Sequence, residues 1–227
     1  MFATESYKSA GEINQAMGRV YGYMGLATLV SMFVSFAVGT NPDLVKFFFT
    51  GIMHWVVIFA PLVAVFILVP FIGANPPKGL ALLALAGFAA LMGLSFAVIF
   101  AVYTMLSIFN AFMGAAVLFS VMSFYGYFTK KDLSGIGSLL FVGLIAIIIA
   151  SIINIFIGST VAQMVISAIA ILIFLGFTAY DTQQIREAVT YDSSTSVEVL
   201  GALNLYLDFI NLFLNLLQLF GVSKSDD

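Results

Sequence analysis

Seven long stretches of almost uninterrupted apolar residues divide this chain, and they constrain its fold more than any other feature. A helix rises about 1.5 Å per residue, so about 20 apolar residues cross the roughly 30 Å hydrocarbon core of a bilayer. The stretches lack the alternation of apolar and polar residues that a membrane β-barrel requires. The sequence therefore predicts an all-α polytopic membrane protein with seven transmembrane helices. The predicted spans are residues 20–38, 52–72, 79–103, 107–128, 136–156, 161–183 and 199–221.

The overall composition agrees with this class and excludes several others. Hydrophobic residues make up 62% of the chain and charged residues only 8%, whereas about a quarter of the residues of a soluble domain are charged. Membrane lipid is therefore the expected surrounding. The net charge of −3 is small, so nucleic acid is not expected as a partner. The chain has no cysteine and only one histidine, His54, which excludes disulfides and multi-histidine zinc sites, and no cofactor is expected.

The polar residues between the spans predict the domain organisation and the orientation. We expect a short polar segment at the membrane surface over residues 1–18, one transmembrane domain over 19–222 and a short tail over 223–227. With seven spans, the N-terminus shares its side of the membrane with the second, fourth and sixth connectors. Basic residues favour that side, which predicts a cytoplasmic N-terminus. They are Lys8, Arg19, Lys78, Lys130, Lys131 and Arg186, against Lys46 and Lys224 on the opposite side.

The last predicted span carries a stripe of polar side chains. Their spacings of 4, 3, 4 and 3 residues place all five on one face of a helix. A carboxylate that faced lipid at mid-helix would cost about 2.5–3.5 kcal/mol, so the stripe is expected to face other helices or water. Its amides fit either an ion pathway or hydrogen bonds between helices. The five residues are Asn204, Asp208, Asn211, Asn215 and Gln218.

A second acid, Asp181, lies near the end of the sixth span. The seventh span begins on that same side of the membrane, so Asp181 and Asp208 are expected in the same half of the bilayer. Two carboxyl groups that approach each other in a low dielectric cannot both stay ionised, and they would share a proton. When ionised, the same pair offers hard oxygen ligands for calcium. We therefore expect Asp181 and Asp208 to act as a pH-sensing gate and as a calcium site.

Two motifs in the last two spans resemble those of a known family. The run Ala-Tyr-Asp-Thr-Gln-Gln-Ile at 179–185, and the run Ala-Leu-Asn-Leu-Tyr-Leu-Asp-Phe-Ile-Asn-Leu-Phe-Leu at 202–214, resemble motifs of the Bax inhibitor family. This family is also called the transmembrane Bax-inhibitor-motif family. Residues 93–96, 102–104 and 130–133 resemble its central region. The likeness extends over the whole chain from the first span onward.

The resemblance implies a fold and a function. The implied fold has six helices around a central seventh, and the implied function is a pH-sensitive calcium leak controlled by two aspartates, which map onto Asp181 and Asp208. It also implies a bacterial inner membrane protein involved in stress responses. One departure is visible: a bacterial relative has an arginine near the second span as a counter-charge, whereas residues 56–77 contain no basic residue here. Lys78 or Arg186 would have to replace it.

Two other functions remain open at this point. Tyr180-Asp181, followed by Asp208 in the next span, resembles the presenilin arrangement and suggests an intramembrane aspartyl protease. Against that function, residues 205–207 read Leu-Tyr-Leu rather than the Gly-x-Gly of that family. The other alternative is a stress or cell-death regulator that binds membrane-protein partners such as a membrane protease. We expect the leak, with calcium as the permeant ion, and no enzymatic activity.

Overall fold

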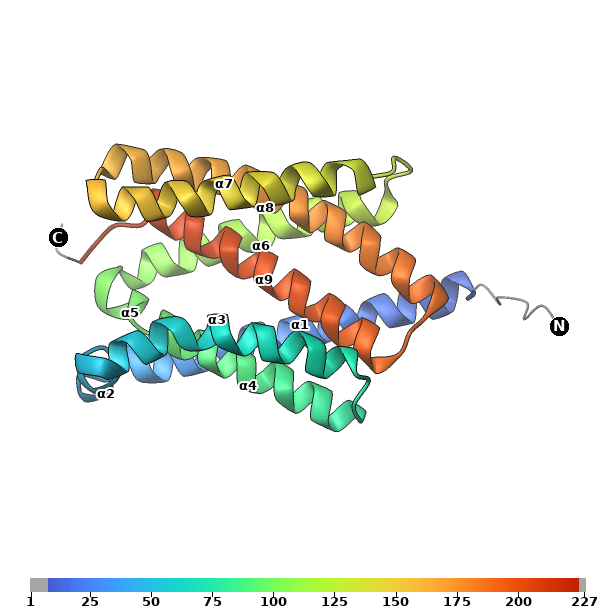
Figure 1. The fold of residues 1–227 in the computed structure, drawn as a ribbon, viewed down its shortest axis with the longest axis horizontal. Helices are drawn as coiled ribbons and strands as arrows, with labels where there is room; N and C mark the ends of the chain where they lie inside the picture. The colour runs from blue at the N-terminus through green and yellow to red at the C-terminus, as the bar shows by residue number, and fades with distance from the viewer. Residues whose placement is uncertain (1–7, 225–227) are drawn as a thin grey trace. The chain divides into compact units, whose positions relative to one another are not determined.

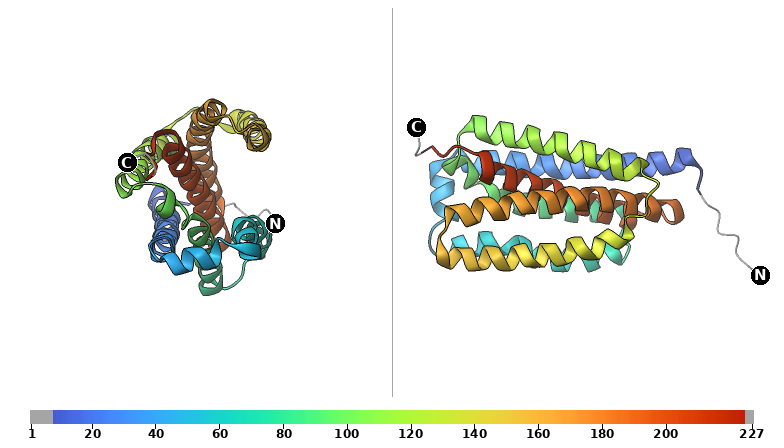
Figure 2. Two further views of the ribbon diagram at one scale, coloured as in Figure 1. Left: turned by 90° about the vertical axis from the view of Figure 1, so that its left-hand side faces the viewer. Right: turned by 90° about the horizontal axis from the view of Figure 1, so that it is seen from above.

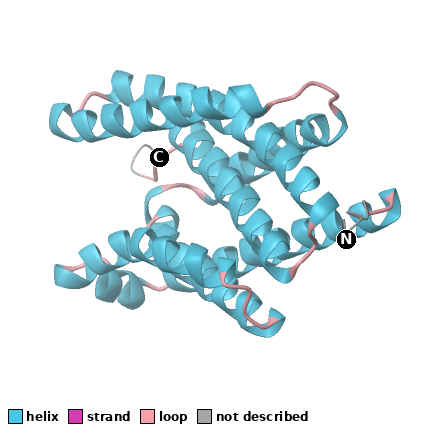
Figure 3. Cartoon of the chain, turned by 45° about the vertical axis from the view of Figure 1, so that its right-hand side comes forward, coloured by secondary structure: helices cyan, strands magenta, loops and turns pink. Residues whose placement is uncertain are grey.

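The computed structural model describes residues 8–224, which contain nine α-helices and no β-strand (Figures 1 and 3). Residues 1–7 of the predicted polar segment and residues 225–227 of the predicted tail lie outside the described residues. The helices are α1 (Ala10–Gly39), α2 (Pro42–Phe48), α3 (Gly51–Gly73), α4 (Lys78–Phe96), α5 (Ile99–Val102), α6 (Met105–Phe128), α7 (Ser134–Ile157), α8 (Thr160–Tyr191) and α9 (Thr195–Phe220).

Seven of these helical segments are long and apolar enough to cross a membrane, which confirms the predicted class and number of spans. They are α1, α3, α4 together with α5, α6, α7, α8 and α9. Large apolar side chains cover their outer surfaces: Phe66 of α3 is 72% exposed and Leu139 of α7 is 70% exposed. Because contiguous apolar surface of this extent is not stable in water, lipid must cover it. The chain is an integral membrane protein.

The helix ends differ from the prediction in two places. Helix α1 begins at Ala10, ten residues ahead of the predicted start of the first span at Val20, because Ser9 and Glu12 form a capping box in which each side chain bonds the backbone of the other residue. Part of the predicted surface segment is therefore continuous with the first span. The connector predicted over residues 185–198 is also mostly helical, since α8 extends to Tyr191 and α9 begins at Thr195.

The described chain forms two compact units. Unit 1 contains residues 8–103 and 185–206, and unit 2 contains residues 104–184 and 207–224. In unit 1, α1 packs closely on α4, where a Cβ added to Gly93 would lie 2.5 Å from the Ser31 carbonyl oxygen. The Ser31 hydroxyl bonds the hydroxyl of Tyr206, from the first part of α9, at 2.6 Å. These contacts hold the first part of α9 in unit 1.

Unit 2 is built from α6, α7, the larger part of α8 and the second part of α9. Helices α7 and α8 run side by side as a hairpin (Figures 1 and 2), and Gly176 of α8 packs against the side chain of Leu140 in α7. The second part of α9 packs on α6 through aromatic rings. Phe209 lies edge-on to Phe112 at 5.3 Å and to Phe119 at 5.8 Å between ring centroids.

Helix α9 is the most buried of the seven spans. In its most apolar 18-residue stretch, 67% of the residues are buried, against 33% or less in the other six spans. For α7 the share is only 6%, so that helix presents most of its surface to lipid. The burial of α9 explains how a span can carry polar residues, because neighbouring protein replaces lipid around it.

Candidate functional site

The motif at residues 179–183 fixes α8 against its neighbours in unit 2. A Cβ added to Gly126 of α6 would overlap the backbone of Ala179, so the two helices touch there directly. The ring of Tyr180 lies over Gly137 of α7, where an added Cβ would come within 2.6 Å of the ring. Small residues that allow such close approach are typical of contacts between membrane helices.

Two polar side chains of the same motif extend these contacts by hydrogen bonds. The hydroxyl of Thr182 bonds that of Ser123 in α6 at 3.0 Å, and both residues are buried. The amide oxygen of Gln183 accepts from the backbone N–H of Leu133 at 2.8 Å, and its amide nitrogen donates to the Lys131 carbonyl at 2.9 Å. Gln183 therefore joins α8 to the loop between α6 and α7 by two hydrogen bonds.

Asp181 lies on the face of α8 that these contacts leave free. Adjacent helical residues are turned by about 100° from each other, so Asp181 is turned about 200° from both Ala179 and Gln183. It is partly buried, whereas Asp208 of α9 is only 5% exposed. Both acids belong to unit 2. The structure thus places the two acids in the same compact unit, on the consecutive helices α8 and α9.

The site contains no counter-charge within residues 8–224. Neither Asp181 nor Asp208 pairs with a described Lys or Arg side chain, and one carboxylate oxygen of Asp208, Oδ2, is buried without a hydrogen-bond partner. Lys78, one of the two predicted replacements for the missing arginine, lies instead 5.6 Å from the centre of the Tyr23 ring in unit 1. A buried carboxyl group without a cation favours a shared proton or a bound ion over full ionisation.

The other residues of the predicted polar stripe lie in different surroundings. Asn204 is exposed and belongs to the unit 1 part of α9. The amides of Asn211 and Asn215 donate to backbone carbonyls one turn earlier in α9, both at 2.8 Å. Gln218 accepts from the Ser167 hydroxyl of α8 at 2.9 Å. Within the described chain, the stripe is therefore not one continuous seam of hydrogen bonds between helices.

The predicted calcium site is reduced to the two carboxyl groups. No group of three or more His, Cys, Asp or Glu side chains gathers anywhere in the described part of the chain. Two carboxylates supply at most four oxygens, whereas calcium takes six to eight. Asp181 and Asp208 would therefore need water or carbonyl oxygens to complete the coordination.

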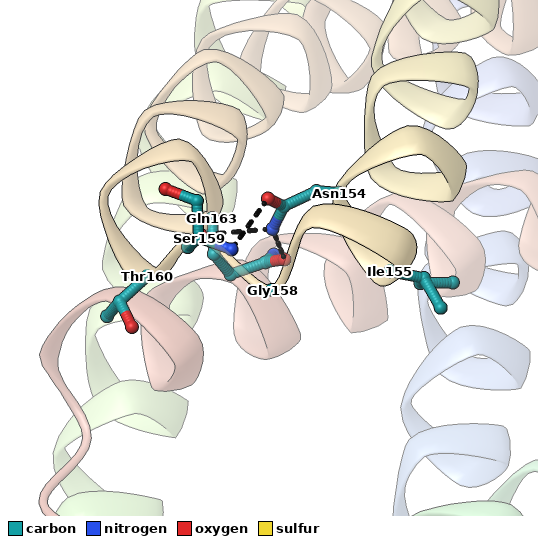
Figure 4. A pocket seen from close by; sticks show the side chains of 6 residues that line it. All are labelled: Asn154, Ile155, Gly158, Ser159, Thr160 and Gln163. Carbon is teal, nitrogen blue, oxygen red and sulfur yellow. Dashed lines mark hydrogen bonds between the residues drawn. The ribbon is translucent and has the colours of Figure 1, made fainter.

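A second polar feature, which sequence reasoning missed, closes the turn between α7 and α8 (Figure 4). The buried Asn154 amide donates to the Ser159 carbonyl and to the Gln163 side chain, both at 3.1 Å, and accepts from the Ser159 N–H. Gly158 turns the chain with a φ of +68°. A cavity of about 330 Å³ lies beside these residues. Its lining has no ionisable group, and it lies about six helical turns from Asp181 along α8.

Sequence reasoning also missed an ion pair in unit 1. The guanidinium of Arg19 in α1 forms an ion pair with the carboxylate of Glu198 in the first turn of α9, and its Nε donates to both carboxylate oxygens at 2.9 Å. The Glu198 side chain is only 4% exposed. The sequence signal for this pair is Arg19 itself, which lies directly before the first predicted apolar span. The pair fixes the start of α9 to α1.

Comparison with known proteins points to one family. Residues 13–225 match the family described as the inhibitor of apoptosis-promoting Bax1. The inner membrane protein YbhL of Escherichia coli K12 is 37% identical over 211 residues, which cover 90% of each chain. An uncharacterised membrane protein of Streptococcus pyogenes serotype M3 is 35% identical over 92% of this chain and 93% of its own. An uncharacterised protein of Borreliella burgdorferi is 35% identical over 94% of both chains.

Proposed function

The chain belongs to the Bax inhibitor family, and from that premise we propose that it is a pH-sensitive calcium (cation) leak channel gated by Asp181 and Asp208. One observation carries the proposal: the carboxyl group of Asp208 is buried inside a span, its Oδ2 atom has no hydrogen-bond partner, and no cation pairs with it in the described chain. Ionisable groups inside spans generally serve ion pathways or proton relays. The membrane is the inner membrane, as it is for the E. coli relative.

The chemistry of the pair supports a gate that responds to protons. When the two carboxyl groups share a proton, a hydrogen bond joins α8 to α9. When the proton leaves, the two negative charges repel each other and offer oxygen ligands to a cation. The proton thus controls both the contact between the helices and the affinity for calcium, the permeant ion. A ligand that favours one of two arrangements shifts the population between them.

The surroundings of the pair support α9 as the element that responds. Ala179, Thr182 and Gln183 fix α8 to α6 and to the loop that follows α6. By contrast, no hydrogen bond joins the Asp208 Oδ2 atom to another described residue. Repulsion between Asp181 and Asp208 would therefore act on α9 more than on α8, which the motif holds to α6 and to the loop after it.

Calcium efflux from liposomes across a pH series tests the proposal. The purified chain should release calcium in a pH-dependent way, and Asp181→Asn or Asp208→Asn should each flatten that dependence, because asparagine keeps the shape and cannot titrate. The double variant should add little to either single one, because residues that act as a unit are not additive. Asp192→Asn is the matched control, since it removes a carboxylate from the exposed connector between α8 and α9.

Each outcome of the assay has a defined meaning. If both single variants keep the wild-type pH dependence, the sensor lies elsewhere and the proposal is wrong. The same data give the sign of the response: more leak on acidification means that protonation releases a charge-held gate, and less leak means that protonation removes an ion-binding site.

The same two aspartates are also the observation that favours an aspartyl protease. Such an enzyme needs two carboxyl groups on facing helices with a shared proton between them. Incubation of the purified chain with a transmembrane peptide separates the two functions. Cleavage that disappears in Asp208→Asn would replace the leak with a protease, whereas an intact peptide together with calcium efflux supports the leak.

A further inference from the structure

The loop over residues 129–133, between α6 and α7, is held to α8 by one buried side chain. Gln183 is only 5% exposed, and its single carboxamide makes two hydrogen bonds, one to the Lys131 carbonyl and one to the Leu133 N–H. Its neighbour Gln184 makes a longer bond of 3.3 Å to the Ser134 hydroxyl, at the surface. The buried pair of bonds is therefore the stronger attachment of this loop to α8.

The position of Gln183 on α8 decides what these bonds control. It lies two residues from Asp181, which is about 3 Å along the helix axis and about 200° around it. Gln183 thus holds α8 on the face opposite Asp181, at nearly the same level along the helix axis. Ala179, one turn earlier on that face, touches α6 directly. A helix that is fixed at two points on one face has little freedom to rotate about its axis. The side chain on the opposite face, Asp181, is therefore held in one direction.

We propose that Gln183 is a positioning residue, which sets the rotation of α8 through its bonds to the loop and so keeps Asp181 directed at Asp208. The proposal rests on the proposed function only for its effect on the leak, since the positioning itself is a matter of geometry. The two bonds to the loop also explain why residue 183 is a glutamine. A carboxamide donates and accepts at once, as the Lys131 carbonyl and the Leu133 N–H require, whereas a carboxylate only accepts.

The charged and titratable groups around the site are few. Helices α6 and α7 carry no charged residue. The groups on the elements packed against the unit 2 part of α8 are Asp208 of α9, Tyr125 and Tyr127 of α6, and Lys130, Lys131 and Asp132 of the loop. The loop groups are exposed to solvent, so a change in the direction of Asp181 acts mainly on its interaction with Asp208.

A cross-linking experiment tests the geometry without reference to transport. The chain has no cysteine, so the double substitution Asp181→Cys and Asp208→Cys provides the only thiols for a short bifunctional methanethiosulfonate reagent. Gln183→Met, which removes both bonds and keeps the length of the side chain, should slow cross-linking by roughly tenfold. Gln183→Glu keeps the bond from Leu133 and should give an intermediate rate, which also covers the case in which Gln183→Met does not fold.

Two control variants separate positioning from general loosening. Asn154→Leu removes a buried carboxamide of α7 that makes three hydrogen bonds to Ser159 and Gln163, at and beyond the start of α8 and far from Asp181. It should leave the cross-linking rate within about twofold. Gln184→Met removes only the surface bond and should do the same. If Gln183→Met leaves the rate unchanged, or if Asn154→Leu slows it equally, the positioning role is wrong.

A second measurement connects the geometry to the leak. With both aspartates present, Gln183→Met should move the pH midpoint of calcium efflux by about half a unit or more, while Asn154→Leu should leave the midpoint in place. Slower cross-linking together with an unmoved midpoint would contradict the role of Gln183 in gating. Slower cross-linking in a protein that shows no pH-dependent efflux at all would refute the proposed function and leave the positioning role standing.

Discussion

Gly126 of α6 packs directly on the backbone of Ala179 in α8, with no side chain between the two helices. This contact lies within one turn of Thr182, whose hydroxyl bonds Ser123 of α6. Together they form a narrow strip of small and hydroxyl side chains on the part of α8 that is turned away from Asp181. Since polar bonds between membrane helices contribute only about 1 kcal/mol each, close packing at Gly126 is needed to hold α8 firmly.

The first prediction follows from this contact. Gly126→Ala should destabilise the protein by about 1–3 kcal/mol, because the added methyl group meets the backbone of Ala179 and cannot be relieved by a change of rotamer. Thermal unfolding in detergent measures the effect. Gly135→Ala is the matched control in unit 2, because an added Cβ there meets nothing within 4 Å. Equal unfolding temperatures for the two variants would contradict the prediction, because they would mean that α6 and α8 can move apart at Gly126 without a loss of stability.

The number and approximate position of the spans could be predicted from sequence because length and hydropathy alone determine them. The ends could not, because a helix can continue beyond the lipid once its residues are polar. Helix α8 shows this: it extends through Arg186 and Glu187 to Tyr191, and Val189 near its end is fully buried by other parts of the protein. No local pattern distinguishes such an extension from a loop.

The candidate site was predictable only in part. Two aspartates in apolar spans are conspicuous in a sequence with 8% charged residues, and the structure places both in unit 2. The contacts that fix Asp181 were not predictable, since Gln183 bonds residues 50 and 52 positions away. The spacing of the stripe is also a property of α9 alone, and it did not reveal that Asn204 is exposed while Asp208 is buried.

The second prediction concerns the ion pair between Arg19 and Glu198. Arg19→Gln should destabilise the protein by about 3 kcal/mol, because it leaves the nearly buried Glu198 carboxylate without its partner. The exchanged pair, Arg19→Glu with Glu198→Arg, should recover a measurable part of this loss. Denaturant unfolding of the single and double variants checks the result. An exchanged pair that is less stable than both single variants would show that the contact depends on shape rather than on charge.

The third prediction is the orientation, which follows from the basic residues. A reporter fused after Asp227 should lie outside the cytoplasm, and one inserted near Ser134 should lie inside it, because seven spans place these sites on opposite sides. Alkaline phosphatase and green fluorescent protein fusions provide the measurement, since each is active on one side only. Two reporters on the same side would contradict the seven-span topology, and an exchange of sides would reverse the orientation.

The fourth prediction separates the loop acid from the gate. The pKa of Asp132 lies below its ordinary value of 3.8, because the side chain and backbone N–H of Ser134 bond its carboxylate at the start of α7. Because its pKa is lower in the folded protein, ionised Asp132 stabilises the fold at pH values above 3.8. This stabilisation is lost as the pH falls below 3.8 and through the lowered pKa. Between about pH 5 and pH 8 Asp132 therefore stays ionised.

Asp132→Asn should accordingly leave the pH midpoint of calcium efflux unchanged, although Asp132 lies on the loop that Gln183 holds. Asparagine keeps the oxygen that accepts from Ser134, so α7 should begin at the same residue. Efflux from liposomes across that pH range, measured beside Asp208→Asn, gives the comparison. A midpoint that moves in Asp132→Asn as far as in Asp208→Asn would place the proton sensor in the loop rather than between α8 and α9.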